Sequence, residues 1–178
     1  MLRDNKVWMG CTIHSGDREF GVPDEYPLEA AGCRIDENGK KYIRVKGVRW
    51  YTNIDHGRRH NPLSLMSMAD NIKYSKHKDI QGKKYQHYDN YDAIEIPYTD
   101  AIPCDYENLM GVPVTFLDKY CPEQFDIIWQ ACGNTRASAP KEILDEVGYT
   151  IHPEDRGGCG VVNNKRQYAR ILIRKKHL

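Results

Sequence analysis

Short apolar stretches alternate along the chain with polar segments that contain glycine and proline. Stretches rich in β-branched and aromatic residues are typical of strands, because such side chains pack well on a pleated surface. Tyr91–Ile96 alternates with period two and is predicted to be an edge strand that ends at Pro97. The same reasoning predicts strands at residues 6–12, 47–54, 125–129 and 168–174.

Turn signals add one hairpin, and helical patterns are few. Asn38-Gly39 favours a tight turn and predicts a hairpin between Cys33–Ile35 and Tyr42–Val45. Strands outnumber helices, which predicts an α/β or α+β fold that lacks many of the helices of a doubly wound sheet. We predict short helices at 63–69, 115–120 and 140–147, a polar loop from 13 to 27, mostly loops at 100–124, and an irregular region at 133–164.

Composition narrows the class of protein. A chain of 178 residues is expected to form one domain. Its 12 Tyr, 3 Trp and 3 Phe are too many large rings for a disordered chain. No apolar run approaches the roughly 18 residues of a membrane span, and residues 1–6 lack the apolar stretch of a secretion signal. We therefore expect a cytoplasmic protein with no membrane partner.

The formal net charge of +1 conceals blocks of opposite sign. Residues 56–87 hold seven basic and two acidic side chains, and residues 163–178 hold six basic and none acidic. Between them, residues 88–126 hold nine acidic side chains and one basic. Basic blocks suit a polyanion such as DNA, because neutralising phosphates releases counterions. The alternative is that the basic and acidic segments pack beside each other and cancel.

The chain offers no self-sufficient site for metal binding or catalysis. Its six cysteines form no C-x-x-C pair, and His56 and His60, although four residues apart, lack the glutamate of a zinc helix and flank two arginines. Gly157–Gly160 lacks the strand and helix that a phosphate-binding loop needs. Asn61-Pro62-Leu63-Ser64 differs from the Asn-Pro-Pro-aromatic motif of amino-methyltransferases, since it lacks the second proline and the aromatic ring. We therefore predict no metal ligand and no catalytic residue.

A series of motifs in fixed order nevertheless resembles one enzyme family. Tyr88–Ile94 is followed by Asp100–Tyr106, by Met110–Tyr120 and by Pro122–Phe125. This series looks like the C-terminal half of the EcoRI-type adenine-specific DNA methyltransferases. Segments similar to family strands also occur upstream and at the C-terminal end: Asp4–Gly10, Trp50–Asp55 and Tyr168–Arg174.

The resemblance implies both a fold and a reaction. The fold is α/β: the C-terminal part of a Rossmann-like methyltransferase fold, rich in strands and loops and incomplete. Residues 1–55 would supply late strands of the catalytic sheet, 56–126 a basic loop and the family motifs, and 127–178 a variable loop and the final strand. Family members transfer a methyl group from S-adenosylmethionine to N6 of adenine in double-stranded DNA, after flipping the base from the stack. They are bacterial or phage-encoded.

The family's cofactor segment and its Asn-Pro-Pro-Phe motif are expected upstream of the matched region. The chain is therefore expected to be inactive alone, as a fragment, a truncated product or half of a split enzyme with a separately encoded N-terminal half. The cofactor-binding residues stay unknown. The alternative function is a non-catalytic module that only binds DNA.

Three groups of side chains are candidates for contact with DNA. Strand aromatics are more often core residues, and the motif at 89–92 could equally be a turn whose hydrogen bonds are satisfied internally. Asn is also suited to reading adenine N6 and N7. We predict phosphate contacts for Arg58, Arg59, His60, Lys73, Lys76 and Lys78, with a solvated loop as the alternative. We predict contact with the flipped base for Trp50, Tyr51 and Asn53. The family motif Asp89, Asn90, Tyr91 and Asp92 is left without an assigned role.

Overall fold

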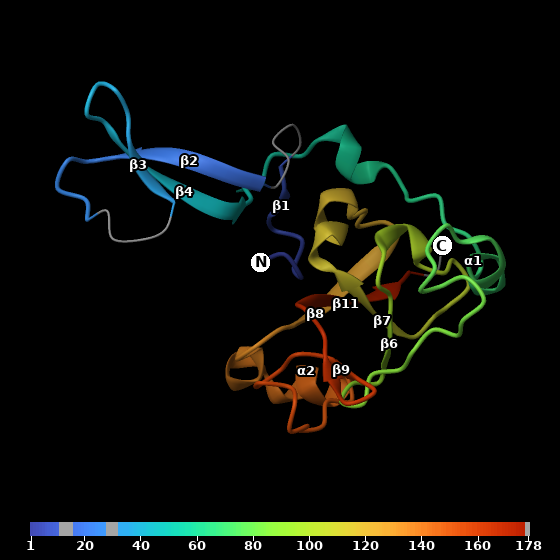
Figure 1. Cartoon of the computed structure of the whole chain (residues 1–178). Helices are drawn as coiled ribbons and strands as arrows, with labels where there is room; N and C mark the ends of the chain where they lie inside the picture. Colours follow the sequence, from blue (N-terminus) through green and yellow to red (C-terminus); the bar gives the residue numbers. More distant parts are fainter. Residues whose placement is uncertain (11–15, 28–31, 177–178) are drawn as a thin grey trace.

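A computed structural model of the chain describes residues 1–10, 16–27 and 32–176. A strand-rich body carries a three-stranded sheet that projects to one side (Figure 1). Among the described residues, no helix is both long and apolar enough to cross a membrane.

The body is built on a four-stranded sheet of order β6-β7-β11-β8. β6 pairs in parallel with β7, and β11 pairs antiparallel with both β7 and β8. The strands are β6 (Ala93–Glu95), β7 (Leu109–Pro113), β8 (Phe125–Ala131) and β11 (Arg170–Lys175). The predicted strands at 91–96, 125–129 and 168–174 are confirmed, including the edge position of β6.

Both faces of this sheet are apolar, so a core cluster lies on each side. Ile171 and Ile173 of β11 pack into one cluster with Phe116 and Phe125, whereas Leu172 packs into the other with Ile128. Five of these six side chains are less than 4% exposed, and the sixth, Ile128, is 9% exposed. This alternation follows from the period of two in a strand, which sends neighbouring side chains to opposite faces.

Short helices cover the sheet and its edges. α1 (Met68–Tyr74) begins after Ser67, whose hydroxyl accepts a hydrogen bond from the Asp70 backbone N–H at 3.0 Å. The predicted helix at 63–69 is therefore displaced toward the C-terminus, because this N-cap fixes where the helix starts. α2 (Lys141–Glu146) and the 3-10 helix η3 (Val114–Lys119) confirm the other two predicted helices. The remaining 3-10 helices are η1 (Gly57–His60), η2 (Thr99–Ala101) and η4 (Thr135–Ser138).

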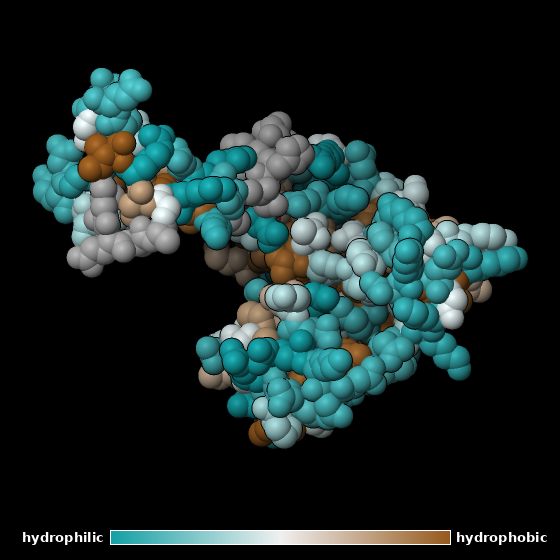
Figure 2. Space-filling model, viewed as in Figure 1, coloured by the Kyte–Doolittle hydropathy of each residue, from teal (hydrophilic) through white to brown (hydrophobic). Residues whose placement is uncertain are grey.

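The projecting sheet has the order β2-β4-β3, with β2 (Gly16–Val22), β3 (Cys33–Ile35) and β4 (Lys41–Val48). The hairpin predicted around Asn38-Gly39 is confirmed, and Asp36 stabilises its turn by accepting hydrogen bonds from the N–H groups of Asn38 and Lys40. The polar loop predicted over 13–27 is wrong at 16–22, where β2 pairs with β4. Hydrophobic side chains are visible among hydrophilic ones on this sheet (Figure 2).

The predictions for residues 47–54, 100–124 and 133–164 agree with the structure only in part. The strand predicted at 47–54 is broken: β4 ends at Val48 and β5 (Tyr51–Thr52) pairs with β1 (Trp8–Met9), which confirms part of the strand predicted at 6–12. Residues 11–12 of that prediction lie outside the described residues. The mostly loop region at 100–124 contains β7. The irregular region at 133–164 contains η4, α2 and β9 (Val161–Val162), which forms a hairpin with β10 (Lys165–Arg166).

The fold is thus mixed α/β with more strand than helix. The described strands of residues 1–55 form sheets of their own and do not join the four-stranded sheet within this chain. The assignment of these strands to a larger catalytic sheet, and the division at residues 55 and 126, stay predictions.

Candidate nucleic-acid interface

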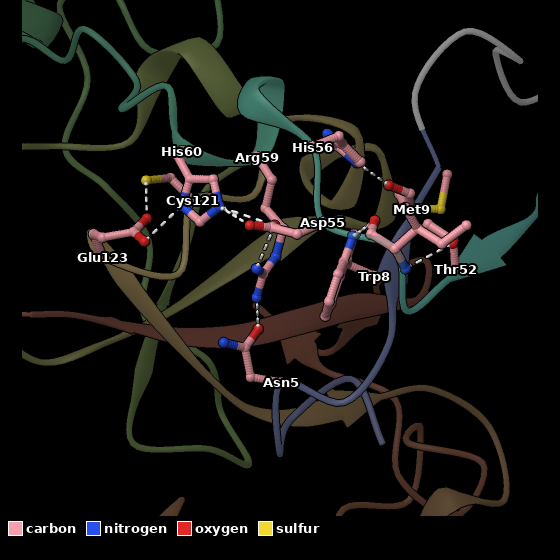
Figure 3. A network of polar contacts seen from close by, with 11 residues as sticks. Asn5, Trp8, Met9, Thr52, Asp55, His56, Arg59, His60, Cys121 and Glu123 are labelled. Carbon is pink, nitrogen blue, oxygen red and sulfur yellow. Dashed lines mark hydrogen bonds and ion pairs between the residues drawn. The ribbon is translucent and has the colours of Figure 1, made fainter.

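Arg59 lies at the centre of a polar network that joins the N-terminal segment to η1 (Figure 3). Its guanidinium is 3.8 Å from the Trp8 ring centroid, donates to Asp55 Oδ1 at 3.1 Å, and also bonds the Asn5 side chain. The residue is only 7% exposed. Arg59 is therefore used inside the protein, which argues against its predicted role as a phosphate contact.

His60 is held between two carboxylates. Its Nε2 lies 2.9 Å from Asp55 Oδ1 and its Nδ1 lies 2.7 Å from Glu123 Oε1. These contacts, first with Asp55 and then with Glu123, raise the pKa of His60 above its ordinary value. The same bond to His60 is the main reason why the pKa of Asp55 is lowered. A protonated His60 is thus already neutralised by the protein, which leaves it little charge to offer a phosphate.

Arg58 is exposed and, unlike its two neighbours, makes no side-chain ion pair among the described residues. It lines a cavity of about 280 Å³ together with Lys119, an exposed cation with the same lack of an ion pair. The rest of the lining is mixed apolar and polar: Asn61, Pro62, Leu63, Ser64, Leu65, Thr99 and Asp100. We call this cavity the Arg58 pocket.

The three predicted lysines have different surroundings. Lys76 Nζ lies 2.7 Å from Asp100 Oδ2, and Lys73 lies over the Tyr74 ring at 4.9 Å from its centroid. Lys78 is exposed without an ion pair in the described part of the chain. Only Lys78 therefore presents a fully available ammonium group, while Lys76 would first have to leave Asp100.

The three candidates for contact with the flipped base differ in how exposed their side chains are. The Trp50 ring packs on the backbone of Gly10, where a Cβ atom would overlap it, so Trp50 supports the pairing of β1 with β5. This packing argues against Trp50 as the stacking surface for a flipped base, although its side chain is half-buried and not fully covered. Tyr51 is 45% exposed and Asn53 is exposed, so both keep their side chains free for a ligand.

The motif at residues 89–92 holds the C-terminal hairpin. Asn90 is 1% exposed; its Nδ2 donates to the Cys159 carbonyl at 2.8 Å and its Oδ1 accepts from the Val161 N–H at 2.9 Å. Tyr91 is also buried and its hydroxyl donates to the Gly158 carbonyl at 2.6 Å. Asp89 accepts from the Asn164 N–H, and the Asp92 N–H bonds the Val147 carbonyl. The Asn90 side chain is therefore used within the protein, which favours the interpretation of a turn satisfied internally over base readout.

Sequence reasoning missed Lys119 and the lining of the Arg58 pocket. Lys119 is the single basic side chain of the acidic block 88–126, so a count of charges per segment concealed it. Residues 61–64 also carry a sequence pattern that predicts the entry to a helix, but they lie between η1 and α1 and line the cavity instead. In the described ranges no group of three or more His, Cys, Asp and Glu side chains is placed to hold a metal ion.

Comparisons with known proteins match almost the whole chain. Residues 1–176 match the family model described as adenine-specific methyltransferase EcoRI. The chain is 36% identical over 178 residues to the type II methyltransferase M.EcoRI of Escherichia coli, covering all of this chain and 45% of that protein. It is 32% identical over 181 residues to the type II methyltransferase M.MgeORF184P of Mycoplasma genitalium, covering 99% of this chain and 52% of that protein.

A third relative is the type II methyltransferase M.MpnI of Mycoplasma pneumoniae, 26% identical over 179 residues, with 99% of this chain and 51% of that protein covered. No solved structure matches. The chain therefore spans about half the length of the curated relatives it matches. Because the family model covers residues 1–176, the chain belongs to the EcoRI family of adenine-specific methyltransferases.

Proposed function

We propose that the chain is the DNA-contacting C-terminal half of a site-specific DNA adenine-N6 methyltransferase. In the complete enzyme a methyl group would pass from S-adenosylmethionine to N6 of an adenine in double-stranded DNA. Family membership supports this proposal, and the relatives are named as type II methyltransferases.

The Arg58 pocket is the observation that carries the DNA-contacting role. Arg58 and Lys119 place two cations without ion pairs beside one cavity, in the part of the chain that the structure describes. Pro62, Leu63 and Leu65 supply an apolar wall, while Asn61, Ser64 and Thr99 supply hydrogen-bonding groups. A DNA strand presents phosphates, which attract cations, and sugars and bases, which contact apolar and hydrogen-bonding groups. The lining of the Arg58 pocket offers both kinds of group.

The glycine-rich loop of this chain does not fit S-adenosylmethionine. A Cβ atom at Gly158 would lie 2.6 Å from Thr135 Oγ1 and 2.8 Å from the Cys132 carbonyl oxygen. The space beside this glycine is thus filled by the protein itself and not left open for a ligand. We therefore assign no cofactor-binding residue here and expect the cofactor to be held by the N-terminal half of the complete enzyme, with the Asn-Pro-Pro-Phe segment.

Tyr51 and Asn53 are the proposed contacts for the extruded adenine. Both side chains are exposed just before Asp55 and η1, so they lie on the same segment as Arg58. A tyrosine ring can stack on a base, and an asparagine side chain can bond the N6 and N7 edge of adenine.

Transfer of a labelled methyl group to duplex DNA tests the proposal. The chain would be supplied together with a polypeptide that contains the Asn-Pro-Pro-Phe segment, and each half would also be assayed alone. We expect N6-methyladenine only in the mixture. Methylation of cytosine, or full activity of the N-terminal half alone, would contradict the assignment.

The second candidate function is a DNA-binding module without transferase activity. It is favoured by Asn61–Ser64, which lacks the second proline and aromatic ring of an amino-methyltransferase motif and lines a cavity instead. This module would bind duplex DNA equally well with and without the catalytic half, and the mixture would yield no methylated base.

A further inference from the structure

The β9–β10 hairpin and the residues that follow it form a second cationic surface. Asn163 and Asn164 have positive φ angles of 50° and 58°, which gives the two-residue turn that suits the twist of a hairpin. Val161 and Val162 are buried on one strand, while Lys165 and Arg166 are exposed on the other. The hairpin thus inserts one strand into the body and presents two cations to solvent.

The hairpin is firmly held at its base. Asn90 bonds both Cys159 and Val161, Asp89 Oδ2 accepts from the Asn164 N–H at 2.8 Å, and the Gln167 N–H bonds the Gly160 carbonyl at 2.8 Å. A preorganised element loses little conformational entropy when it binds a partner. The cations of the hairpin are therefore positioned before any ligand arrives.

Contacts to a distant segment extend this surface. Asn163 Nδ2 donates to Gln86 Oε1 at 3.1 Å, which places the hairpin turn beside the segment that carries Lys84. Lys84, Lys165 and Arg166 are all exposed, and none makes an ion pair among the described residues. Asp89 is the nearby acid, but one of its oxygens is already bonded to the turn. The lobe that holds β9 and α2 is largely hydrophilic in Figure 2.

The exposed aromatic ring of Tyr168 follows these cations in the chain. It is 88% exposed, more than any other large hydrophobic side chain described for this protein. It follows Arg166 by two residues and precedes β11, so it leaves the body next to the hairpin. Cations combined with an exposed ring match the two parts of a nucleotide, because phosphates attract the charges and bases or sugars pack on the ring.

We propose that the β9–β10 hairpin with Lys84 and Tyr168 is a DNA-contacting element separate from the Arg58 pocket. Lys84, Lys165 and Arg166 contact phosphates, and the Tyr168 ring packs against a base or sugar. The inference rests on the proposed function in one respect, that DNA is the substrate. The cations without ion pairs favour a polyanion, and the ring favours nucleic acid over a simple acidic peptide.

The test is the salt dependence of duplex DNA binding by the full chain. Each lost phosphate contact lowers the slope of log affinity against log salt by about 0.9. We expect the double variant K165A/R166A to lose about two contacts, and Lys141→Ala, an exposed lysine on α2, to leave the slope unchanged. An equal slope for K165A/R166A and Lys141→Ala, at an unchanged thermal midpoint, would overturn the inference. If K165A/R166A has a lowered thermal midpoint, K165Q/R166Q serves instead.

Tyr168 has its own signature. Tyr168→Ala should weaken binding at every salt concentration by roughly 5- to 150-fold with the slope unchanged, as expected for a lost ring contact. Tyr168→Phe keeps the ring and should bind like the parent. Tyr26→Ala should also have no effect, because Tyr26 is an exposed tyrosine in the segment after β2, outside the hairpin. Identical affinities for Tyr168→Ala and Tyr26→Ala would remove the ring from the proposal.

Two controls separate the inference from the proposed function. If the unaltered chain binds no DNA at all, the proposed function fails. If it binds and the hairpin variants do not differ from their controls, only the hairpin assignment fails. Polyglutamate that competes as well as DNA at equal charge would identify an acidic polypeptide as the partner and overturn the choice of DNA.

Discussion

Two basic segments of similar appearance in the sequence have opposite fates in the structure. In Arg58-Arg59-His60, two of the three side chains are bound by Asp55, Glu123, Asn5 and Trp8. In the β9–β10 hairpin, Lys165 and Arg166 make no ion pair within the described ranges. Other groups of the protein therefore bind two of the three cationic side chains in the first segment, whereas Lys165 and Arg166 of the second face solvent.

The difference shows that a count of charges is a poor guide to a DNA-binding surface. What matters is whether a carboxylate from elsewhere in the chain reaches the cation. For His60 that carboxylate comes from Glu123, 63 residues away. For the hairpin, Asp89 bonds the backbone of the turn and makes no ion pair with a side chain among the described residues.

Removal of the Asn90 side chain should lower the stability of the chain the most, because this side chain holds the base of the β9–β10 hairpin. Asn90→Ala leaves the buried Val161 N–H and the Cys159 carbonyl without their partner, and each such group costs about 1–3 kcal/mol. We expect the free energy of unfolding to fall by about 3 kcal/mol in denaturant titration. Gln86→Ala, which removes exposed bonds to Asn163 of the hairpin and to the Lys84 carbonyl, should change the free energy of unfolding by less than about 0.5 kcal/mol. Equal effects of the two variants would show that Asn90 does not anchor the hairpin.

Arg59→Ala should be the next largest change, and it separates stability from binding. The variant loses the contact with the Trp8 ring and the bonds to Asp55 and Asn5, so we expect a loss of about 2 kcal/mol of unfolding free energy. The salt slope of DNA binding should stay unchanged, because Arg59 is buried. A lower slope with unchanged stability would instead restore Arg59 as a phosphate contact.

The sequence predicted elements whose signal is local and missed those fixed by distant partners. The apolar runs at 125–129 and 168–174 are strands, because each is apolar enough to fill a core on both faces of a sheet. The sequence does not predict β7, because Gly111 and Pro113 indicate a loop. The pairing of β7 with β11 is set by residues far along the chain. β2 is polar, and it is stabilised by Glu19 and Asp17, which pair with arginines of β3 and β4.

The same limit applies to the candidate site. Sequence reasoning selected Arg58 and the residues beside it, but it could not show that Trp8 covers Arg59 or that Lys119 lies next to Arg58. For Asn90 it left base readout and a satisfied turn both open, and the bonds to Cys159 and Val161 decide for the turn.

Arg58 offers a direct contrast with its neighbour. Arg58→Ala should lower the salt slope of DNA binding by about 0.9, as should Lys119→Ala, because each would lose one phosphate contact at the Arg58 pocket. Neither variant should change the unfolding free energy by more than about 0.5 kcal/mol, since both side chains are exposed. A salt series of binding isotherms with Arg59→Ala as the matched control measures this. If all three slopes coincide, the pocket is not a DNA contact.

The smallest expected effect is a pH dependence of stability that comes from His60. Its pKa is raised in the folded chain by Asp55 and then Glu123, so its stabilising contribution is complete below the unfolded value of about 6.5. That contribution is lost as the pH rises through the higher folded value. The pKa values of both carboxylates are lowered, so they stay ionised throughout this window. Thermal midpoints of the parent should therefore fall more between pH 6 and pH 9, a range of about 3 units around the His60 transition, than those of His60→Gln. Parallel curves for the two proteins would show that the carboxylates around His60 do not hold its proton, and its charge would then be available to DNA.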